Sequence, residues 1–150
     1  MPAASNTAGD GEEPPITDAV LWTDGGARGN PGPAGAGAIL KAPDGTVLAT
    51  ESHYLGHTTN NVAEYRALLL GLERALALGV RRIEVRADSE LLIKQLLGEY
   101  RVKNEGLKPL FAEAKAFLAR FDSYVLTHVR RELNAEADQL ANDGIDRRST

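Results

Sequence analysis

The chain has 150 residues, of which 43% are hydrophobic and 25% charged, values that are typical of one globular domain. Its formal net charge of -4 argues against a protein that holds nucleic acid by bulk positive charge. Since the sequence contains no cysteine, disulfides and thiolate metal sites are excluded, and the chain suits the reducing cytoplasm, where we expect it.

Residues 1–17 predict a disordered tail, because they are rich in small and polar residues and poor in bulky apolar ones. They lack the basic start and the apolar core of a secretion signal or membrane anchor. Apolar runs elsewhere fall well short of the roughly 20 residues that cross a bilayer. We therefore expect one domain at 18–146, a short C-terminal tail at 147–150, no membrane partner and a monomeric protein.

The first half of the domain predicts three strands followed by a helix. Short apolar runs predict the strands at about residues 19–24, 36–41 and 47–54. The turn sequence Ala-Pro-Asp-Gly at 42–45 indicates a hairpin between the second and third strands. Leucines at helical spacing then predict a helix that begins near Asn61 and ends at Gly79.

The second half alternates strands and helices. The predicted elements are a strand at 82–87, a helix from Ser89 to Leu97, a helix at about 107–121, a strand at 124–128 and a helix from 135 to near Gly144. The complete order is βββαβααβα. It predicts an α/β fold in which a five-stranded mixed sheet carries helices on both faces.

Four carboxylates fall at or near the ends of these elements. Asp24 ends the first predicted strand and Asp88 follows the fourth, whereas Glu64 and Asp138 fall in the first turns of two helices. If the first and fourth strands are parallel neighbours, their carboxyl ends lie side by side, at the edge where open α/β sheets place their sites. The pattern therefore predicts that four acids from distant positions meet at one edge.

Each acid also has a plainer structural explanation. Glu64 has capping-box spacing from Asn61, and Asp138 suits the dipole at a helix start. Asp24 and Asp88 each fit a turn after a strand. The functional interpretation depends on convergence, because all four plainer explanations must hold together to defeat it.

The segments around the acids resemble the four active-site blocks of type 1 ribonuclease H, in family order and with family-like spacing. The segments are TDGGARGNPG at 23–32, TTNNVAE at 58–64, ADSE at 87–90 and NAEAD at 134–138. The resemblance covers about 18–146. It implies a ribonuclease H-like sheet and an endoribonuclease that hydrolyses the RNA strand of RNA–DNA hybrids, such as primers and R-loops, leaving 5'-phosphate and 3'-hydroxyl ends.

The resemblance also implies two Mg²⁺ ions, with Mn²⁺ as a substitute, held by the catalytic acids Asp24, Glu64, Asp88 and Asp138. The physical chemistry agrees, because clustered carboxylates raise one another's pKa until cations are bound, and hard divalent cations prefer oxygen ligands. Two such ions about 4 Å apart would flank a phosphodiester. Bound cations would also let an acidic protein hold a polyanion.

A further set of residues is implied to bind the hybrid. The glycine-rich segment would lie along the RNA strand, where the 2'-hydroxyl is read, and the start of the first helix would hold a DNA phosphate. The implied substrate-binding residues are Gly25, Gly26, Arg28, Asn30, Thr59, Asn60, Asn61 and Glu90.

The chain departs from many family members in two places. A mobile histidine usually precedes the last acid, but here that stretch offers only His128, which falls in a predicted strand. The short loop resembles the branch with an arginine instead, and Arg131 is the candidate to stabilise phosphate charge or release product, since it cannot act as a base at neutral pH. Residues 98–106 leave no room for the basic protrusion of some relatives, so double-stranded RNA stays open as a second substrate.

Two alternative functions compete with hydrolysis of hybrids. Another nuclease or strand-transfer enzyme of the same fold often has a different last acid and usually lacks the TTNN segment. A non-catalytic hybrid- or RNA-binding module would gain nothing from clustered negative charge facing phosphates. The sequence therefore favours a metal-dependent nuclease.

Overall fold

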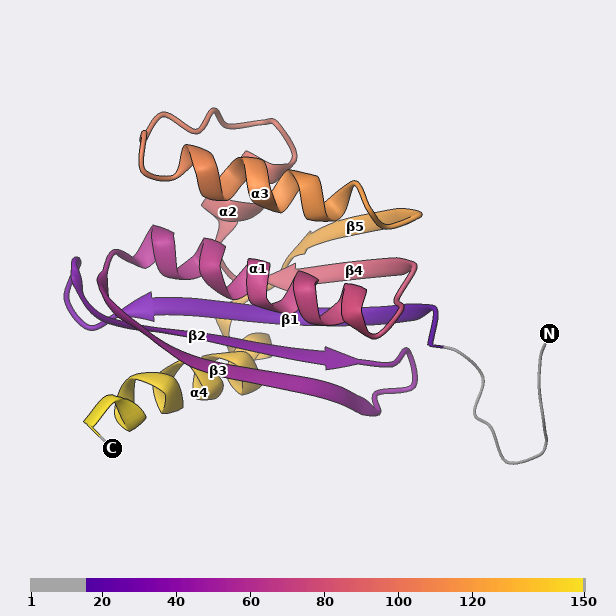
Figure 1. Cartoon of the computed structure of the whole chain (residues 1–150), viewed down its shortest axis with the longest axis horizontal. Helices are drawn as coiled ribbons and strands as arrows, with labels where there is room; N and C mark the ends of the chain where they lie inside the picture. Colours follow the sequence, from indigo (N-terminus) through magenta and orange to yellow (C-terminus); the bar gives the residue numbers. More distant parts are fainter. Residues whose placement is uncertain (1–15, 150) are drawn as a thin grey trace.

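The computed structural model describes residues 16–149, so nearly all of the tail predicted at 1–17 lies outside the described residues. A twisted sheet of five strands has the order β3-β2-β1-β4-β5 (Figure 1). Its strands are β1 (Asp18–Ala27), β2 (Gly32–Lys41), β3 (Val47–Thr58), β4 (Arg82–Ala87) and β5 (Ser123–His128). The first three strands pair antiparallel, whereas β1–β4 and β4–β5 pair parallel, which confirms the predicted mixed sheet.

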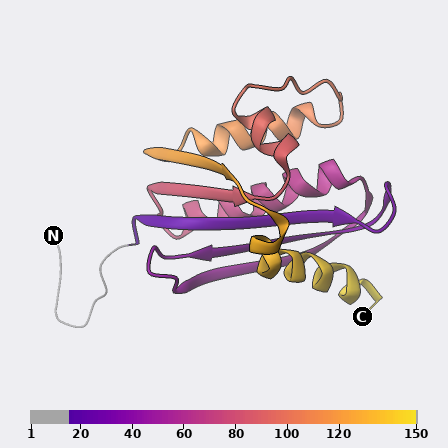
Figure 2. The same cartoon turned by 180° about the vertical axis from the view of Figure 1, so that it is seen from behind.

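Helices cover both faces of the sheet, as predicted (Figures 1 and 2). The helices are α1 (Asn60–Ala77), α2 (Glu90–Leu96), α3 (Lys108–Leu118) and α4 (Ala135–Asp146), with short 3-10 turns η1 (Arg131–Asn134) and η2 (Arg147–Ser149). The α1 helix packs on one face of the sheet beside α3, and α4 lies on the opposite face over β2 and β3. Within residues 16–149, no helix combines the length and the apolar character needed to cross a bilayer.

The main core lies between the sheet and the α1–α3 layer. Leu68 and Leu72 of α1 are fully buried there, against Leu21 of β1 and Val85 of β4. These positions follow the two periods visible in the sequence, near 3.6 for the helix and 2 for the strands. The buried apolar contacts hold α1 and the parallel pair β1–β4 in fixed relative positions.

The opposite face is packed with small residues instead. An added Cβ on Gly37 would overlap the carbonyl oxygen of Ala137, and one on Gly35 would overlap that of Ala141. Glycine is thus required in β2 because the backbone of α4 lies directly against it. This close approach fixes the height of α4 above the sheet.

Several element boundaries differ from the prediction: β2 begins at Gly32 rather than residue 36, and β3 continues to Thr58 rather than ending at residue 54. The β1 strand does not end at Asp24 but continues to Ala27, because Gly25, Gly26 and Ala27 pair with β2 in the antiparallel register. The glycine-rich segment is therefore mostly strand, and its turn is confined to 28–31. The α4 helix also passes beyond Gly144, which is buried against the backbone of His53 rather than ending the helix.

Candidate active site

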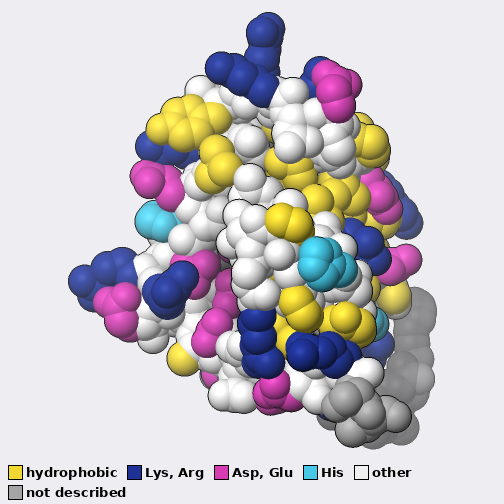
Figure 3. All heavy atoms as spheres, turned by 90° about the vertical axis from the view of Figure 1, so that its left-hand side faces the viewer, with side chains coloured by type: hydrophobic (Ala, Val, Ile, Leu, Met, Phe, Trp, Pro, Cys, Tyr) yellow, Lys and Arg dark blue, Asp and Glu magenta, His cyan; other side chains and the backbone are white. Residues whose placement is uncertain are grey.

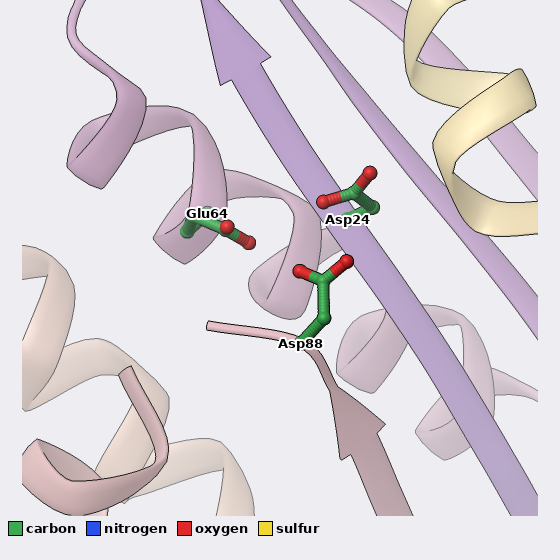
Figure 4. A group of neighbouring side chains, drawn as sticks. All are labelled: Asp24, Glu64 and Asp88. Carbon is green, nitrogen blue, oxygen red and sulfur yellow. The ribbon is translucent and has the colours of Figure 1, made fainter. Parts of the chain in front are cut away.

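Carboxylates from three elements meet at the carboxyl end of the parallel pair. Asp24 lies on β1, and Asp88 directly follows β4. The two acids are neighbours because the residues before them, Thr23 and Ala87, are paired in the register of these strands. Carboxylate oxygens of Asp24, Glu64 and Asp88 all lie within 4.8 Å of one another, and Figure 4 shows the three side chains turned toward a common space. The predicted meeting of these three acids is present in the structure.

The fourth acid joins them from the other face of the sheet. Asp138 lies in the first turn of α4, as predicted, and lines the same cleft of about 360 Å³ as the other three acids. Its carboxyl group is near enough to that of Asp24 to help raise the pKa of Asp24. Asp138 itself stands outside the close cluster of three.

The position of Glu64 differs from the prediction in one respect. The α1 helix begins at Asn60, and Thr59 is its cap, with Oγ1 accepting from the Val62 amide at 3.3 Å. Glu64 therefore lies beyond the first turn, and the proposed capping box with Asn61 is wrong. Since Glu64 is not needed as a cap, its side chain is left to face the other acids.

Burial makes the ionised form of these clustered carboxylates unfavourable when no cation is bound. Asp24 is only 8% exposed, and burial, followed by the charge of Asp88 and by hydrogen bonding and charge from Asp138, raises its pKa to about 8. Burial, and then the charges of Asp24 and Asp88, also raise the pKa of Glu64 well above its usual range.

The free oxygen of Glu64 fits a bound cation. Its Oε1 is buried and has no hydrogen-bond partner among the residues that the structure describes. A buried carboxylate oxygen without a partner is unfavourable, whereas a hard divalent cation would satisfy it. The donor set, all oxygen and acidic, therefore fits a divalent metal centre.

We expect the metal-free protein to lose stability as the pH rises from about 4 to 8. The folded pKa of Asp24, about 8, lies above its ordinary value of 3.8, so the folded state keeps a proton that the unfolded chain has released. The stabilising contribution is complete below the lower value and is lost as pH rises through the upper one. Urea unfolding in chelator at pH 5 and pH 8.5 would measure the decline.

The Asp24→Asn variant should lose less stability between pH 5 and pH 8.5 than the wild type, because the titrating carboxyl group is gone. Asp122→Asn serves as the control, since Asp122 is an exposed acid paired with Arg81 away from the cleft. An equal decline in Asp24→Asn and the wild type would contradict the prediction.

The predicted substrate segment is bound tightly to the start of α1. The Ala27 amide donates to Asn60 Oδ1 at 2.8 Å, and the Asn60 amide donates to Asn30 Oδ1 at 3.0 Å. Gly25 is buried beneath α1, where an added Cβ would overlap the carbonyl oxygen of Ala63. Two of the three asparagines predicted to touch the hybrid, Asn30 and Asn60, thus also hold the 28–31 turn in place.

The other predicted substrate residues lie in different settings. Gly26, Arg28 and Asn60 line the cleft with the acids, whereas Asn30, Thr59, Asn61 and Glu90 do not. The exposed Glu90 forms an ion pair with Lys94 at 3.1 Å. Thr59 accepts the capping hydrogen bond, so its hydroxyl proton is left to donate.

Of the two candidates for the assisting role, Arg131 lines the cleft and His128 does not. Arg131 begins η1 and lines the cleft, where its charge partly offsets the upward shift of the Glu64 pKa. His128 ends β5, is exposed and does not line the cleft. The position of Arg131 supports its choice as the assisting residue.

Two polar residues of the site were missed in the sequence. Asn142 lines the cleft one helical turn after Asp138 and donates to its carbonyl oxygen at 3.1 Å. The buried Asn134 donates to the Thr23 carbonyl at 2.8 Å and so joins the start of α4 to β1 beside Asp24. The i, i+4 spacing from Asp138 could have indicated Asn142, whereas the contact of Asn134 depends on tertiary structure.

Basic side chains surround this end of the molecule. Figure 3 shows Lys and Arg around the margins of this face, interspersed with Asp and Glu, and mostly uncharged surface near its centre. This distribution can attract a polyanion at the margins in spite of the net charge of -4.

Comparisons with known proteins agree on one family. Residues 22–144 match the family model described as reverse transcriptase-like. A bifunctional protein of Mycobacterium tuberculosis is 44% identical over 128 residues, which cover 85% of this chain and 35% of that protein. A ribonuclease H of Rhodopseudomonas palustris is 35% identical over 164 residues, covering 97% of this chain and 94% of that protein.

A solved structure gives the same result. The crystal structure of LC11-RNase H1, a protein isolated from compost, in complex with an RNA/DNA hybrid has a TM-score of 0.84 and 44% identity, covering 88% of this chain and 99% of that one. The chain spans about a third of the length of the mycobacterial relatives that it matches.

Proposed function

The chain belongs to the ribonuclease H family, and from this premise we propose that it is a metal-dependent endoribonuclease that cuts the RNA strand of RNA–DNA hybrids. The observation that carries the proposal is the cluster of Asp24, Glu64 and Asp88, whose oxygens lie within 4.8 Å of one another. The hybrid-bound relative with 44% identity supports the substrate. The activity would serve the removal of primers and R-loops.

Asp24, Glu64, Asp88 and Asp138 would hold two divalent cations, Mg²⁺ or Mn²⁺. When bound, these ions supply an activated water and stabilise the leaving 3'-oxygen, which leaves 5'-phosphate and 3'-hydroxyl ends. The chain contributes rigidity, because Asp24 is fixed within a paired strand and Glu64 within a long packed helix. Such fixed ligands need little rearrangement during the reaction.

The hybrid would be bound by the residues that border this cleft. Gly26 and the turn at 28–31 would lie along the RNA strand, and Asn30 and Asn60 would use their Nδ2 groups, since Oδ1 of each is already engaged. Thr59, at the start of α1, would hold a phosphate of the DNA strand, with Asn60 and Asn61 nearer its bases. Glu90 would contact the minor groove of the hybrid once its ion pair with Lys94 is broken.

We assign the chain to the short-loop branch, in which an arginine takes the place of the mobile histidine. Arg131→Ala is expected to slow turnover about tenfold, because it removes the positively charged guanidinium that lines the cleft and acts on Glu64. His128→Ala should change turnover less than about twofold. Single-turnover cleavage of a labelled hybrid measures both variants, and the opposite order of effects would refute the assignment.

The central test compares nucleic acids directly. The RNA–DNA hybrid, the RNA duplex, single-stranded RNA and the DNA duplex are incubated with Mg²⁺, Mn²⁺ or chelator, with Glu64→Gln as the inactive control. We expect cleavage of the RNA strand of the hybrid that depends on metal and leaves 5'-phosphate ends. Binding of hybrid without cleavage in either metal would favour a non-catalytic module, and cleavage of the RNA duplex would add a second substrate.

A further inference from the structure

The side chain of Arg28 connects the substrate turn to α4. Its Nη1 donates to Asp146 Oδ1 at 2.8 Å and its Nη2 donates to Asn142 Oδ1 at 3.2 Å. Asn142 in turn donates through Nδ2 to the Asp138 carbonyl oxygen at 3.1 Å. A continuous set of hydrogen bonds thus runs from the turn to the residue that carries the fourth acid.

This connection contributes little to overall stability. The side chains of Arg28 and Asp146 are 45% and 61% exposed, and exposed ion pairs contribute only about 0–1 kcal/mol. The planar guanidinium fork nevertheless contacts two acceptors at once, which a lysine could not reproduce. Its role is therefore to be sought in the geometry of the cleft, which Arg28 and Asn142 both line.

The turn is fixed from both sides by different residues. Asn60 holds it to α1, the helix of Glu64, and Arg28 holds it to α4, the helix of Asp138. The amide of Arg28 also donates to the Pro33 carbonyl at 2.8 Å, which closes the turn itself. The helices that carry two of the four acids, Glu64 and Asp138, are thus both joined to this turn by side-chain contacts.

We propose that Arg28 is a positioning residue, which sets the substrate turn at a fixed distance from α4 and so aligns the RNA strand with Asp138. The inference rests on the proposed function and specifies how its site is assembled. It replaces the simpler expectation that Arg28 binds the hybrid directly, because both ends of the guanidinium are already engaged on α4.

Steady-state cleavage of a labelled hybrid in Mg²⁺ distinguishes the two roles. Arg28→Ala and Asp146→Ala should each lower kcat about tenfold and change KM less than about threefold. The double variant should be no worse than Arg28→Ala alone, because the two residues act through one contact. Arg81→Ala is the matched control, since it removes an equally exposed Arg–Asp pair from the opposite end of the strands and should leave kcat unchanged.

A phosphate-binding role would give a different pattern and would overturn the proposal. Asp146→Ala would then free the arginine and lower KM, and Arg28→Ala would raise KM at constant kcat and reduce the salt slope by about one. Additive losses in the double variant would also count against a shared contact.

Amide hydrogen exchange without substrate separates failure of the inference from failure of the function. Arg28→Ala, but not Arg81→Ala, should speed exchange of the residue 28 amide at least about fivefold. If the wild type fails to cut hybrid but this exchange accelerates, only the proposed function fails. Unchanged exchange together with unchanged kcat would overturn the positioning role.

Discussion

Asp24→Asn is expected to lower cleavage of the hybrid at least about a thousandfold while the fold is retained. Oxygens of the Asp24 side chain lie within 4.8 Å of ligand oxygens on Glu64 and Asp88, and Asp24 shares the cleft with Asp138. An amide offers one oxygen and no charge, so cations would be held weakly and out of place. Single-turnover cleavage in Mg²⁺, with circular dichroism of the same sample, measures both parts of the result.

The same substitution should stabilise the metal-free protein on the order of 2 kcal/mol at pH 7. Asp24 is buried beside other acids, and its raised pKa of about 8 shows that the folded state disfavours its anion. Urea unfolding in chelator tests this, with Asp122→Asn as an exposed control. A variant that cuts hybrid at the wild-type rate, or one that is less stable than the wild type in chelator, would contradict the metal site.

Gly37→Ala is expected to destabilise the protein by about 3 kcal/mol and to slow cleavage about tenfold or more. The added methyl would overlap the Ala137 carbonyl oxygen and approach the Ala141 amide to 2.6 Å. Because both are backbone atoms of α4, no side chain can move aside and the helix itself must shift. That shift would displace Asp138, which follows Ala137 directly.

A matched glycine substitution separates packing from loss of flexibility. Gly106→Ala places a methyl in a loop, where Asn104 Oδ1 at 3.2 Å is the nearest atom, and should change the free energy of unfolding by less than about 0.5 kcal/mol. Urea unfolding followed by single-turnover cleavage would compare the two variants. Equal stabilities would show that α4 does not depend on close contact with β2.

The arrangement of the acids could be predicted because it follows from local patterns. Asp24 comes at the end of an apolar run and Asp88 after an alternating one, and a parallel pairing of the two strands brings their side chains together. The helical spacing of Leu68 and Leu72 predicted which face of α1 packs on the core, and both side chains are buried there. These signals lie within short segments and need no knowledge of tertiary contacts.

Other details could not be predicted, because their partners are distant in sequence or because adjacent residues offered the same local signal. The glycines after Asp24 suggested a turn, whereas Gly25 is required in the strand because the Ala63 carbonyl lies against it. The cap of α1 is Thr59 rather than Asn61, and four successive polar residues gave no means of choosing between them. The partner of Arg28 is 118 residues away, beyond the range of any local pattern.

Because α4 follows all five strands along the chain, its position has a consequence for synthesis of the protein on the ribosome. Domains fold as the chain emerges, amino end first, and here the strands and α1 can assemble before the last helix exists. Until α4 docks, the glycines of β2 face solvent, Arg28 lacks its acceptors and Asp138 is absent from the cleft. On the proposed function, a nascent chain would stay inert toward nucleic acid until α4 has emerged from the ribosome and docked on the sheet.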